Sequence, residues 1–244
     1  KEAWDLNQKR SSVLVGGMMW LKMGNGQKKT VVDLSGLGLD QIRETEEEFI
    51  IGCMCTLRQL ELHQGLNREF DGLFRDCVKH IVGVQFRNGA TVGGSVFGRY
   101  GFSDVLTGLM ALETEVELYQ GGRMSLEEFG AMPYDRDILV GIRVRRDGRK
   151  AAYISQRNTE TDFPVIACAL SRKGDQWNVS VGARPKRAES RIICGTGKTA
   201  GELAEEAAGL FDYGSNMRAS GQYRAHLARV YIERLAAQLM GEEA

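Results

Sequence analysis

Short apolar runs separated by glycines and charged residues organise the first part of the chain. Residues 13–15 (Val-Leu-Val) end at two glycines, residues 18–23 are typical of a short helix, and residues 31–34 form a second apolar run. This order predicts a small strand–turn–helix–strand unit. Residues 1–8 resemble the end of a helix, so we expect the natural chain to begin further upstream.

The next apolar segments predict a mixed α/β layer. Residues 49–55, 115–119 and 139–145 have the composition of strands. Thr56 is suited to cap a helix that continues to residue 62, and residues 104–112 have the pattern of another helix.

The pattern changes after the charged stretch at residues 143–150. Residues 165–171 and 177–182 alternate like the two strands of a hairpin, and residues 190–194 form a candidate third strand. We therefore expect a domain boundary near Asp147.

Two helices are predicted to follow these strands. Thr199 and Glu202 have the spacing of a capping box for a helix that runs to about residue 211, and apolar residues at helical spacing between 223 and 235 predict a final helix. The expected fold class is α+β. The expected domains are residues 1–146, with lobes of about 1–40 and 41–146, and residues 147–244.

The amino-acid composition argues against several functional classes. Lysine plus arginine (32) balances aspartate plus glutamate (32), so the chain lacks the basic excess that nucleic-acid binding needs. No run approaches the roughly 20 apolar residues of a membrane span, and the first residues carry no signal-peptide pattern. We expect a soluble, cytoplasmic protein without a nucleic-acid partner.

Cysteine and histidine do not suggest a metal centre in this chain. The five cysteines are scattered except for Cys53 and Cys55, and no pair has the spacing of a zinc or iron–sulfur site. The three histidines do not lie at ligand spacing to one another.

The first glycine-rich place is Gly16-Gly17. A strand that ends in two glycines and enters a helical turn exposes backbone N–H groups, which suits a pyrophosphate. The alternative is an ordinary tight turn.

The second glycine-rich place is the segment from Thr91 to Ser95, followed by Asp104. Glycine lets a ligand lie close to the backbone, the two hydroxyls are possible donors, and the carboxylate can accept from a sugar hydroxyl. The alternative is a β-bend with Asp104 in the first turn of the next helix, where a carboxylate is favoured.

The third glycine-rich place, residues 195–199 (Gly-Thr-Gly-Lys-Thr), has the ending of a phosphate-binding P-loop. That motif also needs a glycine where Ile192 stands, so we interpret the segment as a loop leading into a capped helix. No Gly-x-Gly-x-x-Gly fingerprint of a Rossmann site is present.

Together, these segments resemble one known family. Residues 90–106 (Ala-Thr-Val-Gly-Gly-Ser-Val-Phe-Gly-Arg-Tyr-Gly-Phe-Ser-Asp-Val-Leu) look like the flavin-binding signature of the flavoprotein subunits of xanthine dehydrogenase and carbon monoxide dehydrogenase. Residues 14–17, 32–35, 137–142 and 222–227 are similar to further motifs of that family, in the same order.

The resemblance implies a fold and a role in electron transfer. The fold would be a two-lobed FAD-binding domain of the PCMH type followed by a small C-terminal α+β domain with an antiparallel sheet. FAD would be bound non-covalently, while [2Fe-2S] clusters and molybdopterin would belong to an iron–sulfur subunit and a molybdopterin subunit. FAD would pair single electrons for NAD⁺ or another acceptor, without a catalytic acid or base in this chain.

The resemblance also implies the residues that line the cofactor. Asp104 would hold a ribityl or ribose hydroxyl, and Leu139 would contribute a backbone or apolar contact. The other implied FAD-binding residues are Val15, Gly16, Gly17, Met18, Met19, Trp20, Thr91, Gly93, Gly94 and Ser95.

Some positions depart from the family pattern. Met18 and Met19 replace a hydroxyl and an acidic residue, Ser95 replaces an asparagine, and a lysine expected near the flavin is absent. Each lost side-chain hydrogen bond would weaken FAD binding by about 1 kcal/mol. Two alternatives stay open: a structural subunit with a degraded flavin site, and a free-standing flavin reductase of the same fold.

One loop beside the implied flavin site is a candidate assembly surface. The loop at residues 97–102 carries Arg99 and Tyr100, which could face a partner subunit where electrons enter. The alternative for this pair is ordinary solvated surface.

Overall fold

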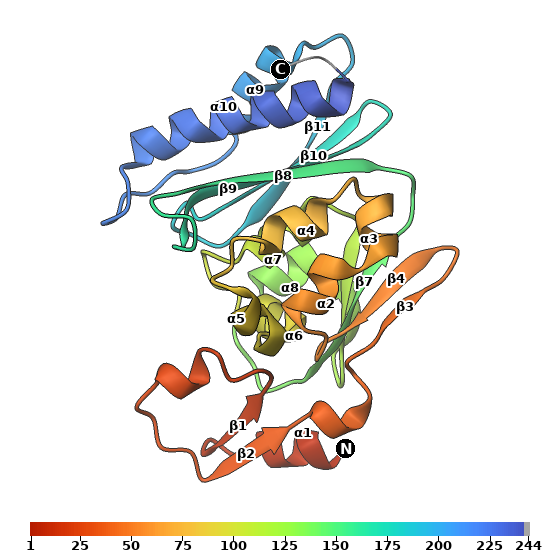
Figure 1. Ribbon diagram of the computed structural model, residues 1–244, viewed down its shortest axis with the longest axis vertical. Helices are drawn as coiled ribbons and strands as arrows, with labels where there is room; N and C mark the ends of the chain where they lie inside the picture. The colour runs from red at the N-terminus through yellow and green to blue at the C-terminus, as the bar shows by residue number, and fades with distance from the viewer. Residues whose placement is uncertain (242–244) are drawn as a thin grey trace.

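The computed structural model describes residues 1–241 and arranges them around three β-sheets (Figure 1). At the N-terminal end, β1 (Ser12–Val15) and β2 (Thr30–Asp33) pair in parallel beside α1 (Glu2–Asn7). The expected helix at residues 18–23 is wrong: only the 3₁₀ turn η1 (Leu21–Met23) forms there. Met18 has a left-handed backbone (φ 58°), so it cannot itself be part of a right-handed helix.

The middle of the chain forms a five-stranded antiparallel sheet. Its order is β3 (Ile42–Glu44), β4 (Glu48–Gly52), β7 (Leu139–Arg145), β5 (Thr114–Leu118) and β6 (Gly122–Ser125). Short helices fill the long connection from β4 to β5. They are α2 (Leu57–Leu62), α3 (Gln64–Glu69), α4 (Leu73–Val78), α5 (Val84–Gly89), α6 (Val92–Phe97) and α7 (Asp104–Met110); η2 (Ser35–Leu37) precedes β3 and α8 (Leu126–Ala131) follows β6.

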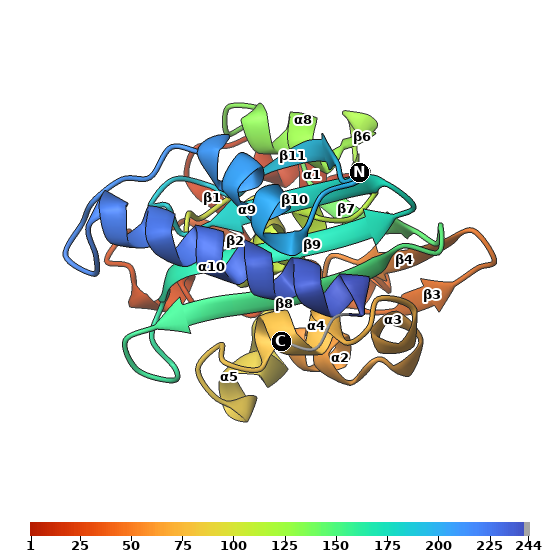
Figure 2. The same cartoon turned by 90° about the horizontal axis from the view of Figure 1, so that it is seen from above.

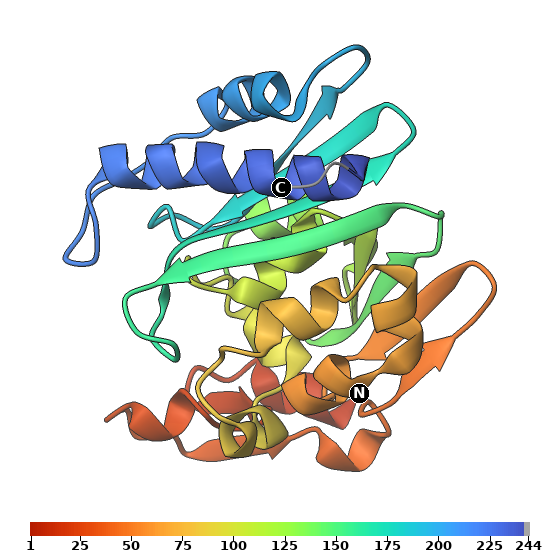
Figure 3. The same cartoon turned by 45° about the horizontal axis from the view of Figure 1, so that its top comes forward.

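The last part of the chain forms a four-stranded antiparallel sheet with two helices. The strand order is β11 (Glu189–Cys194), β10 (Gln176–Gly182), β9 (Pro164–Lys173) and β8 (Lys150–Arg157). The helices α9 (Ala200–Gly209) and α10 (Gly221–Met240) lie across one face, as Figures 2 and 3 show. The opposite face contacts α4 and α7.

Strand β9 contributes side chains to two hydrophobic cores, one on each face of the four-stranded sheet. Because successive side chains of a strand point to opposite faces, Ile166 and Cys168 pack in the core under α9 and α10, while Ala167 and Ala169 belong to the core around α2–α8. All four side chains are fully buried. Alanine on the second face lets α7 pack closely against the sheet.

The predicted fold class, α+β with antiparallel sheets, is confirmed. The hairpin, the third strand and both predicted C-terminal helices form, with Thr199 and Glu202 as a capping box. Strand β8, which pairs with β9 from Lys150 to Arg157, was not expected. The division into domains near Asp147 stays a prediction. Among residues 1–241, no helix is long and apolar enough to cross a membrane.

Candidate functional site

A cavity of about 550 Å³ lies where the loop after β1, the start of α6 and the β8–β9 loop come together. Its walls are mostly apolar, with contributions from η1, α2 and α5. Four charged residues reach it: Lys22, Asp104, Arg157 and Asp162. An apolar cavity with few polar groups is the usual form of a small-molecule site.

The loop after β1 lies directly against the segment that leads into α6. A Cβ atom on Gly16 would be 2.5 Å from Thr91 Oγ1, and one on Gly17 would collide with the carbonyl oxygen of Gly89. Only glycine permits this approach. Within the described part of the chain, no protein acceptor takes the N–H of Gly17, Met18 or Met19. These donors are therefore free for a ligand.

Residues 92–95 form the first turn of α6, so the alternative of a β-bend is wrong for this segment. Thr91 is the N-cap of α6, and its Oγ1 accepts from Gly94 N at 3.2 Å. The N–H groups of Val92 and Gly93 donate to the carbonyls of Cys55 and Cys53 at 2.8 and 2.9 Å. Because these early N–H groups already have protein partners, the loop after β1 offers the freer donors.

Asp104 is the first residue of α7 and is buried at the cavity wall. Its Oδ1 accepts from Arg157 Nη2 at 2.6 Å and from the hydroxyl of Tyr153. Burial raises the pKa of the Asp104 carboxyl, although Arg157 acts in the opposite direction, and burial beside Asp104 also raises the pKa of Tyr153. Asp104 thus lies both at a helix start and at the cavity.

Four aromatic rings from three segments meet at the cavity. Trp20 stacks on Phe163 (centroids 5.6 Å apart, interplanar angle 19°), and Tyr100 stacks on Phe102 (5.2 Å, 4°). Phe102 also lies 4.3 Å from Phe163 between centroids. The arrangement provides flat apolar surfaces of the kind that bind planar rings.

The structure brings most of the expected site residues together at this cavity. Gly93 and Leu139 are exceptions and do not line it. A Cβ on Gly93 would be 2.5 Å from the carbonyl oxygen of Cys53, and Leu139 is part of the core at the start of β7. The expected residues at the cavity are Val15, Gly16, Gly17, Met18, Met19, Trp20, Thr91, Gly94, Ser95 and Asp104.

Sequence reasoning missed Tyr153, Arg157 and Phe163 as parts of the site. They lie at β8 and the following turn, more than 45 residues from Asp104 in the sequence. An arginine before a turn carries no distinctive pattern, so only the pairing of β8 with β9 reveals it.

Arg99 and Tyr100 have different environments. Arg99 is 2% exposed, and its Nη1 donates to the carbonyls of Phe129 and Met132 at 3.1 and 2.7 Å. Both interpretations of Arg99 as a surface residue are therefore wrong, because its guanidinium holds the end of α8. Tyr100 is partly exposed.

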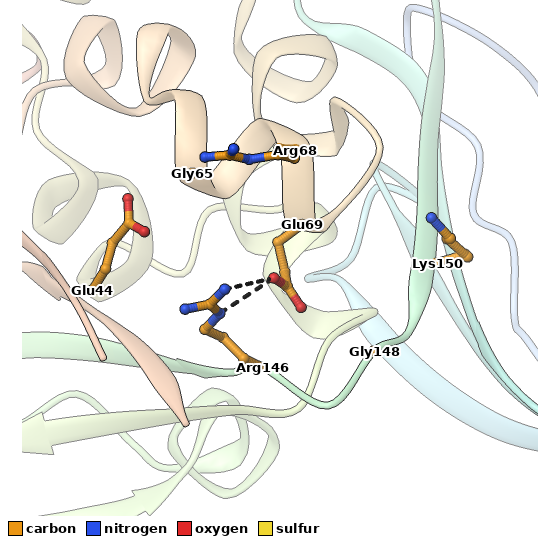
Figure 4. Close-up of a pocket in the computed structure, with 7 residues that line it drawn as sticks. All are labelled: Glu44, Gly65, Arg68, Glu69, Arg146, Gly148 and Lys150. Atoms are coloured by element: carbon orange, nitrogen blue, oxygen red, sulfur yellow. Dashed lines mark hydrogen bonds and ion pairs between the residues drawn. The ribbon is translucent and has the colours of Figure 1, made fainter. Parts of the chain in front are cut away.

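A second, more open hollow of about 490 Å³ is polar (Figure 4). Arg146 donates to Glu69 Oε2 at 3.1 Å, and Lys150 lies 3.3 Å from Asp71 Oδ1. These pairs join α3 and the following turn to the connection between β7 and β8. The paired charges of this second hollow favour a structural role for it. We therefore place the candidate functional site in the apolar cavity.

The chain is similar to known proteins in sequence and in fold. Residues 1–144 match the family described as the FAD binding domain in molybdopterin dehydrogenase. The uncharacterized protein YgfM of Escherichia coli K12 is 24% identical over 221 residues, which cover 89% of this chain and 83% of that protein.

Solved structures share the fold over nearly the whole chain. Quinoline 2-oxidoreductase from Pseudomonas putida 86 has a TM-score of 0.84 at 17% identity, covering 98% of this chain and 94% of its own. A reconstituted CO dehydrogenase from Oligotropha carboxidovorans has a TM-score of 0.85 at 19% identity, covering 99% and 94%. At such identities the likeness shows a common fold.

The residues present fit FAD. The loop after β1 offers unpaired N–H donors for phosphates, the aromatic rings offer surfaces for a planar ring system, and the buried Nε of Arg157 lacks a partner among the described residues. With the family match over 144 of 244 residues, the chain belongs to the family of FAD-binding domains of molybdopterin dehydrogenases.

Proposed function

We propose that this chain is the FAD-binding electron-transfer subunit of a molybdenum hydroxylase. It receives electrons from the iron–sulfur clusters of a partner subunit and passes them through FAD to NAD⁺ or another acceptor. One observation carries the proposal: the loop after β1 and helix α6 bound an apolar cavity, and the chain belongs to this family. CO dehydrogenase and quinoline 2-oxidoreductase share its fold.

The cavity residues divide into three tasks. The N–H groups of Gly17, Met18 and Met19 donate to the pyrophosphate, and Lys22 at the same wall favours its negative charge. Thr91 and Gly94 line the same cavity, and Thr91 lies directly against Gly16 of this loop.

The aromatic residues hold the other end of the cofactor. Trp20, Phe102 and Phe163 provide flat surfaces and exclude water from the ring system. FAD, when bound, exchanges electrons singly or in pairs, so the protein supplies placement and electrostatics and needs no acid or base. FAD is non-covalent in this proposal, because no histidine or cysteine lines the described cavity.

The molybdenum and iron–sulfur centres belong to partner subunits in this proposal. Four of the five cysteines suit packing better than metal binding, since a ligand must be a thiolate and these four are buried. Burial raises the pKa of Cys53 to about 12 and that of Cys55 to about 11. Cys77 and Cys168 are also fully buried, and burial raises the pKa of both thiols.

The test is purification of the tagged chain from cells that also express its iron–sulfur and molybdopterin partners. We expect one FAD per chain, released on denaturation, with iron and molybdenum in the complex and absent from the chain purified alone. The only activity expected of the chain purified alone is the reduction of dyes by NADH. A chain without flavin would support the structural-subunit alternative, and one that works without any partner would support the reductase alternative.

A further inference from the structure

Arg157 is the buried cation at the wall of the cavity. The other cation there, Lys22, is exposed, whereas the side chain of Arg157 is 7% exposed. Arg157 is the last residue of β8 and pairs across the sheet with Pro164, so it lies next to the turn that carries Phe163. The fold therefore places the charge of Arg157 at the cavity wall beside its aromatic part, whereas Arg218 lies over the Phe163 ring, 5.0 Å from its centroid, without lining the cavity.

The guanidinium is held from two sides and has one donor left. Its Nη2 donates to Asp104 Oδ1 at 2.6 Å, and its Nη1 donates to the main-chain oxygen of Asp162. Its Nε is buried and has no partner among residues 1–241. A buried donor without an acceptor is unfavourable, so a ligand acceptor at this point would stabilise the site.

The cavity offers two kinds of surroundings, which meet where Trp20 follows the donor residues Gly17–Met19. Free N–H donors lie at Gly17–Met19, while Arg157 neighbours Phe163, which stacks with Trp20 and contacts Phe102. Phosphates need donors and a flat ring needs apolar faces, so the isoalloxazine belongs at the Arg157 end.

A fixed positive charge beside the isoalloxazine affects its reduction. Reduction of FAD takes up two electrons and one proton, so the cofactor gains one negative charge. The electrons come from the iron–sulfur partner of the proposed function, and the proton comes from water. In a cavity of low dielectric constant, a nearby cation stabilises the reduced form more than the oxidised form.

We propose that Arg157 supplies the positive charge that stabilises reduced FAD, and that Asp104 sets how much of this charge the cofactor experiences. Arg157 is thus a positioning and electrostatic residue for the redox step. Asp104 is its counter-charge, and not primarily a ligand for a sugar hydroxyl. The inference rests on the proposed function for its electron donor.

The experiment measures the midpoint potential of FAD bound to the full chain, by equilibration with redox dyes of known potential. In Arg157→Gln the affinity for reduced relative to oxidised FAD should fall about tenfold, which lowers a two-electron potential by about 30 mV. Asp104→Asn removes the counter-charge and should raise the potential. Arg157→Lys keeps the charge and should restore most of the wild-type value.

The two variants are expected to shift the potential in opposite directions, which distinguishes an electrostatic effect from structural damage. A loosened cavity would shift the potential in the same direction in Arg157→Gln and Asp104→Asn, and that result would overturn the inference, as would an unchanged potential in Arg157→Gln. The matched control is Arg184→Gln, because the Arg184 side chain is also buried with an unpartnered Nε among the described residues but lies outside the cavity. Its potential should stay at the wild-type value.

The inference remains testable if the Arg157→Gln variant does not fold. Should Arg157→Gln not fold, the potential of Asp104→Asn decides: a rise supports the inference, and an unchanged or lower value overturns it. The measurement needs no partner subunit, so a chain that binds FAD but assembles with nothing would contradict the proposed function and still give a potential. A chain that takes up no FAD would overturn both.

Discussion

Arg224 shows how single buried arginines organise this protein. It is 1% exposed on α10, and its Nε donates to the carbonyl of Val165 at 2.8 Å. Its Nη1 donates to the carbonyls of Gly214 and Ala219, both at 2.7 Å. Arg224, which belongs to the motif at residues 222–227, therefore ties the loop before α10 to β9, while the neighbouring Tyr223 is exposed.

Gly17 is the residue at which we expect the smallest change to have a large effect. In Gly17→Ala the new Cβ would overlap the backbone of Gly89, so the loop after β1 must move away from the end of α5. We expect FAD affinity to fall at least tenfold, or about 1.4 kcal/mol. Titration followed by flavin fluorescence measures the change.

Gly36→Ala is the control for this substitution. Gly36 lies in η2, and its added Cβ meets no atom within 4 Å, so FAD affinity should not change. Wild-type affinity in Gly17→Ala would show that the loop does not depend on its contact with Gly89.

At the scale of elements, helix ends are stabilised by side chains that the sequence makes recognisable. Thr199 Oγ1 accepts from Glu202 N at 3.3 Å, and Glu202 Oε2 accepts from Thr199 N at 2.9 Å. Lys198 donates to the carbonyl of Cys194 at 2.8 Å and pairs with Glu206. The segment at residues 195–199 is therefore a loop leading into a capped helix, as predicted.

Loss of this cap should destabilise the protein without affecting FAD. Thr199→Ala should lower the free energy of unfolding by about 1 kcal/mol, because the first turn of α9 loses its acceptor. Urea denaturation measures this, and FAD affinity should be unchanged because α9 packs on the other face of the four-stranded sheet. Thr196→Ala, in the same exposed loop, should change stability by less than about 0.5 kcal/mol. Equal losses in both variants would argue against a capping effect.

At the scale of the whole molecule, the connection between β7 and β8 joins the two larger sheets. Asp147 accepts from Arg149 Nη2 at 2.7 Å and from Lys173 Nζ at 3.3 Å. Burial alone would raise the pKa of the Asp147 carboxyl, but the hydrogen bonds and charges of Arg149 and Lys173 hold that pKa below its usual range.

This junction should make stability depend on pH. A carboxyl whose pKa is lowered by folding stabilises the protein above its ordinary pKa, and this contribution is lost as the pH falls through the folded value. Asp147→Asn should thus unfold more easily than wild type at pH 7, and the difference should shrink below about pH 4. Thermal unfolding from pH 7 to pH 3 tests this; a difference that does not vary with pH would exclude the carboxylate charge as its cause.

Local patterns were enough to identify many elements. Alternating residues predicted the β9–β10 hairpin, Thr56 and Thr199 predicted helix starts, and glycine pairs predicted the two sides of the cavity. Each of these depends on contacts within a few residues, which a sequence displays directly.

The tertiary structure decided which residues line the cavity. Gly93 and Leu139 face protein backbone and core because α6 and β7 turn them away, and no local pattern shows which side of a short helix meets a cavity. The pairing of β8 with β9 brings Arg157 to Asp104, 53 residues away. The sequence alone thus determined many of the elements and the family, while the charge inside the proposed flavin site was decided by long-range packing, since a buried ion pair exists only when both partners are brought together.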